Sequence, residues 1–204
     1  MAPFLFSDLK KSRHEGAKPE PCRIEGDALK NPQIHRSNLL IEVCFMTVPG
    51  HTRGVLMEKM NGSGYSLTVG ASGQMSFQVK GEGGAGQVDG KTKVNDGRWH
   101  HAIVEADRQT RTLAVYVDGR KDATGAGVDG TVSLANEGDV HVGGTPGGRS
   151  LEGAIDFLRI AQGTLADADT TIEELYAWEF DGPQLRDFTG RKPSGARDAG
   201  AVGR

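Results

Sequence analysis

Two alternating runs of apolar and polar residues occupy the middle of the chain. Between the turn signals Asp96-Gly97 and Asp118-Gly119, the segment WHHAIVEAD is followed by a polar turn and then by TLAVYV. Successive side chains of a strand point to opposite faces, so a period of two predicts a strand. Two such runs joined by a short polar turn predict an antiparallel hairpin over residues 96–119. Trp99 is the largest apolar side chain of this hairpin, and we expect it to fill the core.

Other segments show a similar strand pattern. Residues 37–48 contain a nearly continuous apolar run, which predicts a long buried strand. Residues 54–60 and 65–69 predict a hairpin around NGSG. Residues 74–80 alternate between apolar and polar, and we expect their polar face to meet solvent or a ligand. Shorter strands are expected at residues 22–26, 131–134 and 140–142. The Gly-rich segments 81–90 and 125–130 are predicted to be loops.

One helix is expected near the end of the chain. Thr171 and Glu174 have the spacing of a capping box, in which the two side chains bond each other's backbone N–H groups. Ile172, Leu175 and Tyr176 follow at the i, i+3, i+4 spacing of one helical face. Residues 1–20 and 180–204 show little periodicity. We therefore predict a lead-in arm at 1–20, a sandwich domain at 21–179 and an extended tail at 180–204.

Three of these segments also carry a family resemblance. The central hairpin, the segment GVLMEKMNGSGYSLTV at 54–69 and the segment DVHVGGTPGGRSLEGAIDFLRI at 139–160 are similar, in this order, to motifs of laminin-G-like (concanavalin A-like) domains. The resemblance covers about residues 22–165. It implies an all-β, antiparallel jelly-roll sandwich, to which we add the short C-terminal helix and the tail. The fold hosts lectins, glycan hydrolases, lyases and adhesion modules, so it names no ligand.

The tail carries a second resemblance. Residues 180–204, FDGPQLRDFTGRKPSGARDAGAVGR, are similar to the end of bacterial right-handed β-helix proteins of the polysaccharide-lyase type. This resemblance implies an adjacent β-helix domain and an exported bacterial protein, either secreted, periplasmic or on the cell surface. No convincing signal peptide is found in the sequence, and no apolar run approaches the roughly 18–20 residues of a membrane span.

Composition agrees with this fold class and excludes nucleic acid as a partner. Glycine accounts for 30 of the 204 residues while the hydrophobic fraction is 36%, which suits short strands joined by tight turns. The net charge of −3 and the absence of a Lys/Arg cluster interleaved with aromatics give no electrostatic basis for binding nucleic acid. Two cysteines, Cys22 and Cys44, lie in apolar strand contexts, either as buried free thiols or as a disulfide.

Calcium is the metal that the laminin-G-like resemblance implies. Domains of this kind often hold a structural Ca²⁺ with carboxylates and backbone carbonyls, the oxygen ligands that suit a hard cation. The matching positions are Glu25 or Asp27 beside the first strand and Asp156 in the GAID strand, if these strands meet. The alternative is that Asp156 accepts backbone N–H bonds within its sheet.

No catalytic motif is complete. Sandwich glycanases of this fold place carboxylates on one strand as E-x-D-x-E or E-x-D-x-x-E, and neither Glu25-Gly26-Asp27 nor Glu105-Ala106-Asp107 completes that pattern. His100 and His101 are neighbours on a strand, so they point to opposite faces and cannot chelate one ion. We therefore predict no catalytic residues, and a glycan hydrolase or lyase is the third hypothesis.

A non-catalytic carbohydrate-binding or accessory module is the first hypothesis, and a protein-interaction or interdomain packing module without glycan affinity is the second. Aromatic residues make up only 6% of the chain, and most of them are interpreted as core: Phe45, Phe77, Trp99, Tyr116 and Phe157. The remaining candidate ligand contacts are His51, Arg53, Tyr65, Gln78 and Lys80. Such a surface binds through hydrogen bonds and charge, which favours an anionic polysaccharide.

Overall fold

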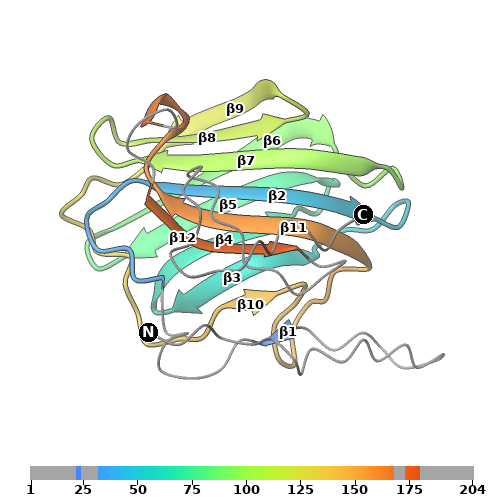
Figure 1. Cartoon of the computed structure of the whole chain (residues 1–204), viewed down its shortest axis with the longest axis horizontal. Coiled ribbons are helices and arrows are strands. Elements are labelled where there is room, and N and C mark those ends of the chain that lie inside the picture. Colours follow the sequence, from blue (N-terminus) through green and yellow to red (C-terminus); the bar gives the residue numbers. More distant parts are fainter. Residues whose placement is uncertain (1–21, 24–31, 168–172, 180–204) are drawn as a thin grey trace, which may run out of the picture.

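The computed structural model describes residues 22–23, 32–167 and 173–179, and this part of the chain forms two antiparallel sheets stacked as a sandwich. The two sheets lie one behind the other in Figure 1, with β2, β7 and β11 in the nearer layer. Every pair of neighbouring strands is antiparallel. The predicted all-β sandwich is confirmed, and its architecture is consistent with a jelly roll.

The strands of each sheet come from distant parts of the sequence. The first sheet has the spatial order β1 (Cys22–Arg23), β10 (His141–Val142), β3 (Val55–Asn61), β4 (Ser63–Val69), β5 (Gln74–Gly81) and β6 (Gly84–Lys93). The second sheet has the order β12 (Glu173–Glu179), β11 (Gly153–Gln162), β2 (Leu39–Thr47), β7 (Trp99–Asp107), β8 (Thr112–Val117) and β9 (Arg120–Ala126). A 3-10 turn, η2, spans Leu165–Asp167.

The core lies between the two sheets and follows the period-two pattern. Phe45 of β2, Phe77 of β5 and Val104 of β7 are fully buried. Burying a side chain of this size stabilises the fold by about 1.5–3 kcal/mol. The long buried strand predicted over residues 37–48 is confirmed as β2, and so is the prediction that Phe45 and Phe77 belong to the core.

Trp99 does not fill the core. Its side chain is 50% exposed, because the alternation that turns His100, Ala102 and Val104 inward turns Trp99 to the outer face of the second sheet. Tyr116 shares this outward direction and is only partly buried, as is Phe157 on β11. The sequence thus predicted correctly which side chains of the hairpin share a face. It was wrong to place Trp99, the largest of them, in the core.

The predicted C-terminal helix is wrong where the structure describes it. Residues 173–179 form β12, which pairs along β11 from Phe157↔Glu179 to Gln162↔Glu173. The capping-box spacing and the i, i+3, i+4 recurrence are local preferences, whereas the exposed edge of β11 offers a row of backbone donors and acceptors. Pairing with that edge outweighs the local preference. Thr171, Ile172 and the tail from residue 180 lie outside the described residues, as does the segment that suggested an adjacent β-helix.

Of the two Gly-rich segments predicted to be loops, residues 81–90 are mostly strand, whereas residues 127–130 of the second are a loop. Residues 84–90 belong to β6, where Gly84, Gly86, Val88 and Gly90 alternate with Ala85, Gln87 and Asp89. A Cβ on Gly86 would come within 2.6 Å of the carbonyl oxygen of Ala126, so glycine is needed where the edges of the two sheets approach. Conversely, residues 131–134 are a loop and not the predicted short strand.

Two buried cations tie loops to the sandwich. The Lys59 ammonium is fully buried and donates to the carbonyl oxygens of Asn136 at 2.9 Å and Gly138 at 2.6 Å. Arg108 is 3% exposed and donates through Nε to the carbonyl of Val128 at 3.0 Å. These contacts satisfy carbonyl groups of the long connection between β9 and β10 that would otherwise be buried without partners.

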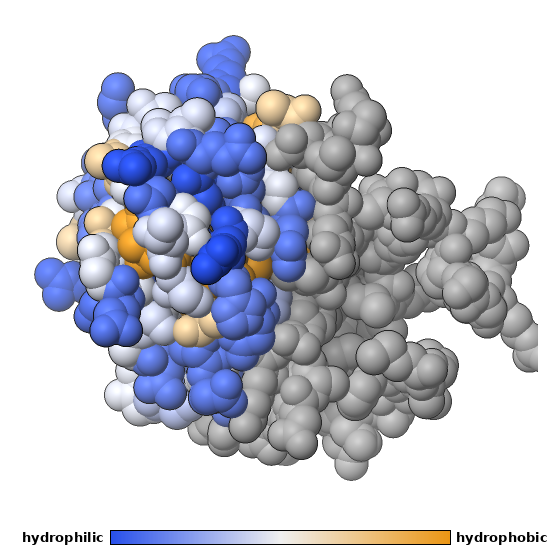
Figure 2. Space-filling view, turned by 90° about the vertical axis from the view of Figure 1, so that its left-hand side faces the viewer, coloured by the Kyte–Doolittle hydropathy of each residue, from blue (hydrophilic) through white to orange (hydrophobic). Residues whose placement is uncertain are grey.

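The described surface of the sandwich is mostly hydrophilic on the side that Figure 2 shows. Figure 2 shows the left-hand end of Figure 1, where hydrophilic residues cover most of the described surface and hydrophobic ones form small patches between them. Cys44 is a free, half-buried thiol on β2. Within the described ranges, no helix is long and apolar enough to cross a membrane.

Candidate functional site

The outer face of the first sheet carries two rows of polar side chains that run across the strands. In the first row, Glu58 of β3 is aligned with Ser66 of β4. Ser66 is aligned in turn with Gln78 of β5, and Gln78 with Gln87 of β6. Neighbouring strands lie about 4.8 Å apart, so each row sets hydroxyl, amide and carboxylate groups at regular intervals.

The second row lies two residues along the strands from the first. Thr68 of β4 is aligned with Ser76 of β5, and Ser76 with Asp89 of β6. The two rows form the floor of a hollow of about 500 Å³. Its lining consists of Arg53, Glu58, Ser66, Thr68, Val69, Gly70, Ala71, Ser72, Gln74, Ser76, Gln78, Gln87, Asp89 and Arg149. We call this set the sheet hollow; it contains no aromatic side chain.

Hydrogen bonds hold part of the floor in place. The Ser76 hydroxyl donates to Asp89 Oδ1 at 2.6 Å, and the Gln87 amide donates to the two Asp89 oxygens at 3.1 and 3.3 Å. These bonds fix the direction of the Gln87 and Asp89 groups before any ligand arrives. Gln74 Oε1 is buried and has no hydrogen-bond partner among the described residues, so the hollow also contains an acceptor that is not yet used.

Two arginines extend the hollow at the end where β3 and β5 begin. Arg53 lies just before β3 with a φ of 61°, a conformation that few non-glycine residues adopt, and its backbone N–H donates to the carbonyl of Gly70. Arg149 comes from the loop that follows β10. Both arginines are exposed, and the lining also includes two carboxylates, Glu58 and Asp89. A carboxylate is well matched by the planar fork of donors on arginine.

The sequence-predicted ligand contacts divide into three groups. Arg53 and Gln78 line the sheet hollow together. Lys80 is exposed on β5 but does not line the hollow, and the His51 side chain is only 8% exposed beside Glu152. Tyr65 is fully buried, and its hydroxyl donates to the carbonyl of Pro32 at 3.1 Å. The prediction of Tyr65 as a surface contact is wrong, because its position on β4 faces the core.

The residues that the prediction missed come mainly from neighbouring strands. Ser66, Thr68, Gln87 and Asp89 enter the hollow only through cross-strand register. A signal for Gln87 and Asp89 was present in the sequence: G-A-G-Q-V-D-G is a period-two pattern in which small residues occupy the inward positions. Arg149 follows the Gly-rich loop, and no local pattern marks it as a neighbour of Arg53.

Of the three predicted metal ligands, Asp156 is the one that lies within the described residues. Asp156 is exposed at an irregularity of β11, between Ile155 and Phe157, whereas β1 pairs with β10 in the other sheet. Glu25 and Asp27 lie outside the described residues. The described ranges contain no group of three or more His, Cys, Asp or Glu side chains that could hold a metal ion. Calcium binding stays a prediction.

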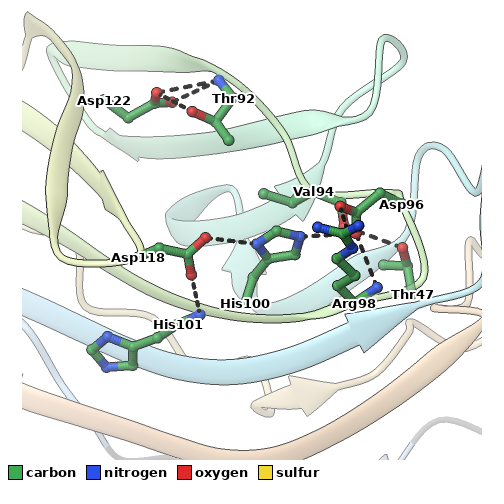
Figure 3. A network of polar contacts seen from close by, with 9 residues as sticks. All are labelled: Thr47, Thr92, Val94, Asp96, Arg98, His100, His101, Asp118 and Asp122. Carbon is green, nitrogen blue, oxygen red and sulfur yellow. Dashed lines mark hydrogen bonds and ion pairs between the residues drawn. The ribbon is translucent and has the colours of Figure 1, made fainter.

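Glu105 and His100, considered above for catalysis or chelation, are hydrogen-bonded within the sandwich. Glu105 accepts hydrogen bonds from the Tyr116 hydroxyl at 2.8 Å and the Leu165 N–H at 2.9 Å. His100 is 7% exposed and lies between two carboxylates, with Nδ1 2.9 Å from Asp118 and Nε2 3.1 Å from Asp96 (Figure 3). His101 points to the outer face, so the prediction that the two histidines face opposite sides is confirmed.

His101 belongs to a second network on the outer face of the second sheet. Its Nε2 lies 2.6 Å from Glu42 Oε1, and the other Glu42 oxygen lies 2.7 Å from Arg159 Nη2. The hydrogen bond to Glu42 raises the pKa of His101. Burial alone raises the pKa of Glu42, but the hydrogen bond to His101 and the charge of Arg159 outweigh it and lower that pKa.

Comparison with known families agrees with this architecture. A family model, Laminin_G_3, described as the concanavalin A-like lectin/glucanases superfamily, matches residues 45–170, which is more than half of the chain. The chain therefore belongs to this superfamily, and the laminin-G-like resemblance is confirmed. No curated protein sequence matches the chain.

Solved structures share the fold at low sequence identity. A Bacteroides ovatus protein provisionally described as carbohydrate-binding is 16% identical, with a TM-score of 0.60, and the match covers 82% of this chain and 50% of that one. Domains LG4-5 of the mouse laminin alpha1 chain are 17% identical, with a TM-score of 0.53, 72% coverage of this chain and 46% of theirs. The chain thus spans about half the length of these structures. At such identities, the similarity establishes a shared fold and not a shared ligand.

Proposed function

We propose that the protein is a non-catalytic carbohydrate-binding module and that the sheet hollow is its binding site. The observation that carries this proposal is the array of hydroxyl and amide side chains set in register across β3 to β6 within a hollow of about 500 Å³. This volume is within the range of small-molecule sites. The Bacteroides ovatus protein of the same fold is provisionally described as carbohydrate-binding. This similarity supports the proposal, but the proposal depends on the side chains of the hollow.

The chemistry of the lining suits sugar hydroxyls. Serine and threonine hydroxyls and glutamine amides both donate and accept hydrogen bonds, as sugar hydroxyls do. The Asp89 carboxylate adds a strong acceptor that Ser76 and Gln87 hold in place. Since the hollow contains no aromatic side chain, binding there relies on hydrogen bonds and charge.

Arginine at the rim favours an acidic polysaccharide. Arg53 and Arg149 converge from separate loops on the same end of the hollow, and each can form two parallel hydrogen bonds with a carboxylate or sulfate group. Glu58 and Asp89 lie on the floor, where they accept hydrogen bonds from neutral hydroxyls. The proposed ligand is therefore a chain whose acidic group sits between the arginines and whose hydroxyls meet the floor.

The biological setting is part of the same proposal. An acidic polysaccharide is met outside the cytoplasm, which supports an exported protein. A binding module that holds such a chain beside a polysaccharide-active β-helix domain is consistent with the tail resemblance at residues 180–204. A structural Ca²⁺ held by Asp156 together with Glu25 or Asp27 remains part of this proposal, with its own test given below.

Affinity for polygalacturonate tests the site directly. We expect binding of polygalacturonate or sulfated dextran by calorimetry, with a much weaker response to fully methyl-esterified polygalacturonate, which has the same backbone without the charge. The double variant Arg53→Ala with Arg149→Ala should lose at least tenfold in affinity, because each charged hydrogen bond contributes about 1.5–3 kcal/mol. Equal binding of polygalacturonate and sulfated dextran indicates a general response to negative charge, whereas tighter binding of polygalacturonate indicates a preference for the carboxylate.

Matched variants locate the binding surface. Arg120→Ala removes an exposed arginine of β9, and Lys80→Ala removes an exposed lysine of β5 outside the hollow; we expect both to bind as the wild type does. Gln78→Ala removes an amide from the floor and should weaken binding without removing the preference for charge. Equal binding by the wild type and the Arg53/Arg149 double variant would contradict this assignment.

A further inference from the structure

A second exposed surface lies on the other side of the sandwich. Within the described part of the chain, two large hydrophobic residues are exposed: Trp99 at 50% and Val48 at 44%. The register aligns Trp99 of β7 with Met46 of β2, and Val48 follows Met46 by two residues. Trp99, Met46 and Val48 therefore form one small apolar patch at the end of these strands, on the outer face of the second sheet.

The patch is too small for a typical protein interface. Such interfaces bury about 800 Å² on each partner, whereas one tryptophan side chain buries about 150–250 Å². Three side chains of which only one is aromatic offer a platform of the size of one or two sugar rings. The backbone of Trp99 is fixed by the pairing of β7 with β2, so the place of the indole on the sheet is set before a ligand binds.

A polar side chain lies on the same face as the indole. His101, two residues along β7, has a side chain that is 43% exposed. Asp156 and Asp118 lie close enough to Cys44, which is aligned with His101, to raise the pKa of its thiol after the larger effect of burial. His101 and Arg159 on this face both contact the Glu42 carboxylate, so neither offers an unpaired charge to an anionic ligand.

We propose that Trp99 is the centre of a second carbohydrate contact, which takes the apolar face of a neutral sugar. A pyranose with equatorial hydroxyls presents C–H groups on its flat faces, which pack on the indole as other apolar groups do. Its hydroxyls then point outward toward His101. This site is on the opposite sheet from the sheet hollow, prefers uncharged sugar where the hollow prefers acidic sugar, and does not depend on the hollow being a binding site.

Fluorine NMR of protein labelled with 5-fluorotryptophan reports on this site in the intact chain. The sequence contains two tryptophans, so two resonances are expected, and the spectrum of Trp99→Phe assigns them. We expect titration with cellohexaose, a neutral β-linked glucose chain, to shift the Trp99 resonance and leave the other in place. Xylohexaose and mannohexaose serve as further neutral probes. A Trp99 resonance that responds to none of the three overturns the proposal.

Three variants separate stacking from folding and from the sheet hollow. Trp99→Ala should weaken cellohexaose binding by about tenfold, whereas Trp99→Tyr, which keeps an aromatic face, should retain most of it. The Arg53→Ala, Arg149→Ala double variant should bind cellohexaose as the wild type does, so failure of one site is distinguishable from failure of the other. Equal cellohexaose binding by Trp99→Ala, or a Trp99 shift that follows protein concentration without sugar, refutes the sugar contact; the latter indicates self-association.

Discussion

At the scale of single residues, the network of His101, Glu42 and Arg159 makes stability depend on pH. The pKa of His101 is raised above its ordinary value of 6.5, so its contribution to stability is complete below about that pH and is lost as the pH rises through the folded-state pKa. The pKa of Glu42 is lowered from 4.5, so its contribution is present above that value and is lost as the pH falls. The network therefore stabilises most between these two values.

Substituting Glu42 tests this network. Glu42→Gln removes the carboxylate that favours the charged imidazole, and we expect the His101 pKa to fall and the acid-side gain in stability to shrink. A pH titration of the histidine Cε1–H resonances by NMR measures the change. Glu152→Gln, at an exposed carboxylate beside His51, is the matched control. A His101 titration that is the same in Glu42→Gln as in the wild type would show that the contact does not persist in solution.

The buried ammonium of Lys59 gives a second prediction at this scale. Lys59→Met keeps the apolar length of the side chain and leaves the carbonyls of Asn136 and Gly138 without their donor. An unsatisfied buried polar group costs about 1–3 kcal/mol, so we expect a loss of roughly 2 kcal/mol or more in the free energy of unfolding. Urea denaturation measures it. Lys80→Met, at an exposed position, should change stability by less than about 0.5 kcal/mol.

At the scale of elements, the central hairpin is closed by Asp118. Its carboxylate accepts a hydrogen bond from the backbone N–H of His101 at 3.0 Å and lies 2.9 Å from His100 Nδ1. The backbone φ of Asp118 is +50°. Asp118→Ala removes both contacts and places alanine in a left-handed conformation, so we expect a loss of about 1–3 kcal/mol in the free energy of unfolding. Asp118→Asn keeps a side-chain acceptor and tolerates that conformation better. Thermal unfolding should therefore rank Asp118→Ala below Asp118→Asn; the opposite order would contradict the role given to the carboxylate.

Elements also show where local sequence patterns were sufficient. The alternation of residues 74–80 and 99–107 predicted which side chains share a face, because burial of one face requires a period of two. The same rule was missed in β6, where glycines stand at inward positions close to β9. It was also missed in β12, whose residues carry a helical spacing but complete the edge of a sheet.

At the scale of the whole molecule, ligands should raise the unfolding temperature. A ligand at 100 times its dissociation constant stabilises the folded state by about 2.7 kcal/mol, which corresponds to a shift of several degrees for a domain of this size. We expect polygalacturonate to produce such a shift in the wild type, to lose it in the Arg53/Arg149 double variant and to keep it in Trp99→Ala. Differential scanning fluorimetry at low and high salt measures it, and the shift should fall at high salt as charge is screened.

The calcium prediction has a separate test at the same scale. If Asp156 and Glu25 or Asp27 hold a structural Ca²⁺, EDTA lowers the unfolding temperature of the wild type and added Ca²⁺ restores it. Asp156→Asn should then unfold at the same temperature with and without EDTA. A wild-type unfolding temperature that does not respond to EDTA or Ca²⁺ would contradict the prediction of a structural calcium ion.

The sequence by itself determined the fold class and most strand faces. Period-two patterns, turn signals and the laminin-G-like motifs are local, and each is read within about 10–20 residues. They identified the polar face of β5 with Gln78, and they placed Arg53 among the candidate contacts. The prediction that this face meets solvent or a ligand therefore needed no knowledge of the other strands.

Only the tertiary structure decided which residues share a surface. The sheet hollow joins Arg53, Gln78, Gln87 and Arg149, whose closeness arises from pairing between strands and from a loop that returns beside β3. Tyr65 and Trp99 exchanged their predicted roles because composition cannot tell which face of a strand is covered by the opposite sheet. Burial and register are properties of the packed sheets, and a local pattern records the alternation of side chains without recording which side becomes the inside.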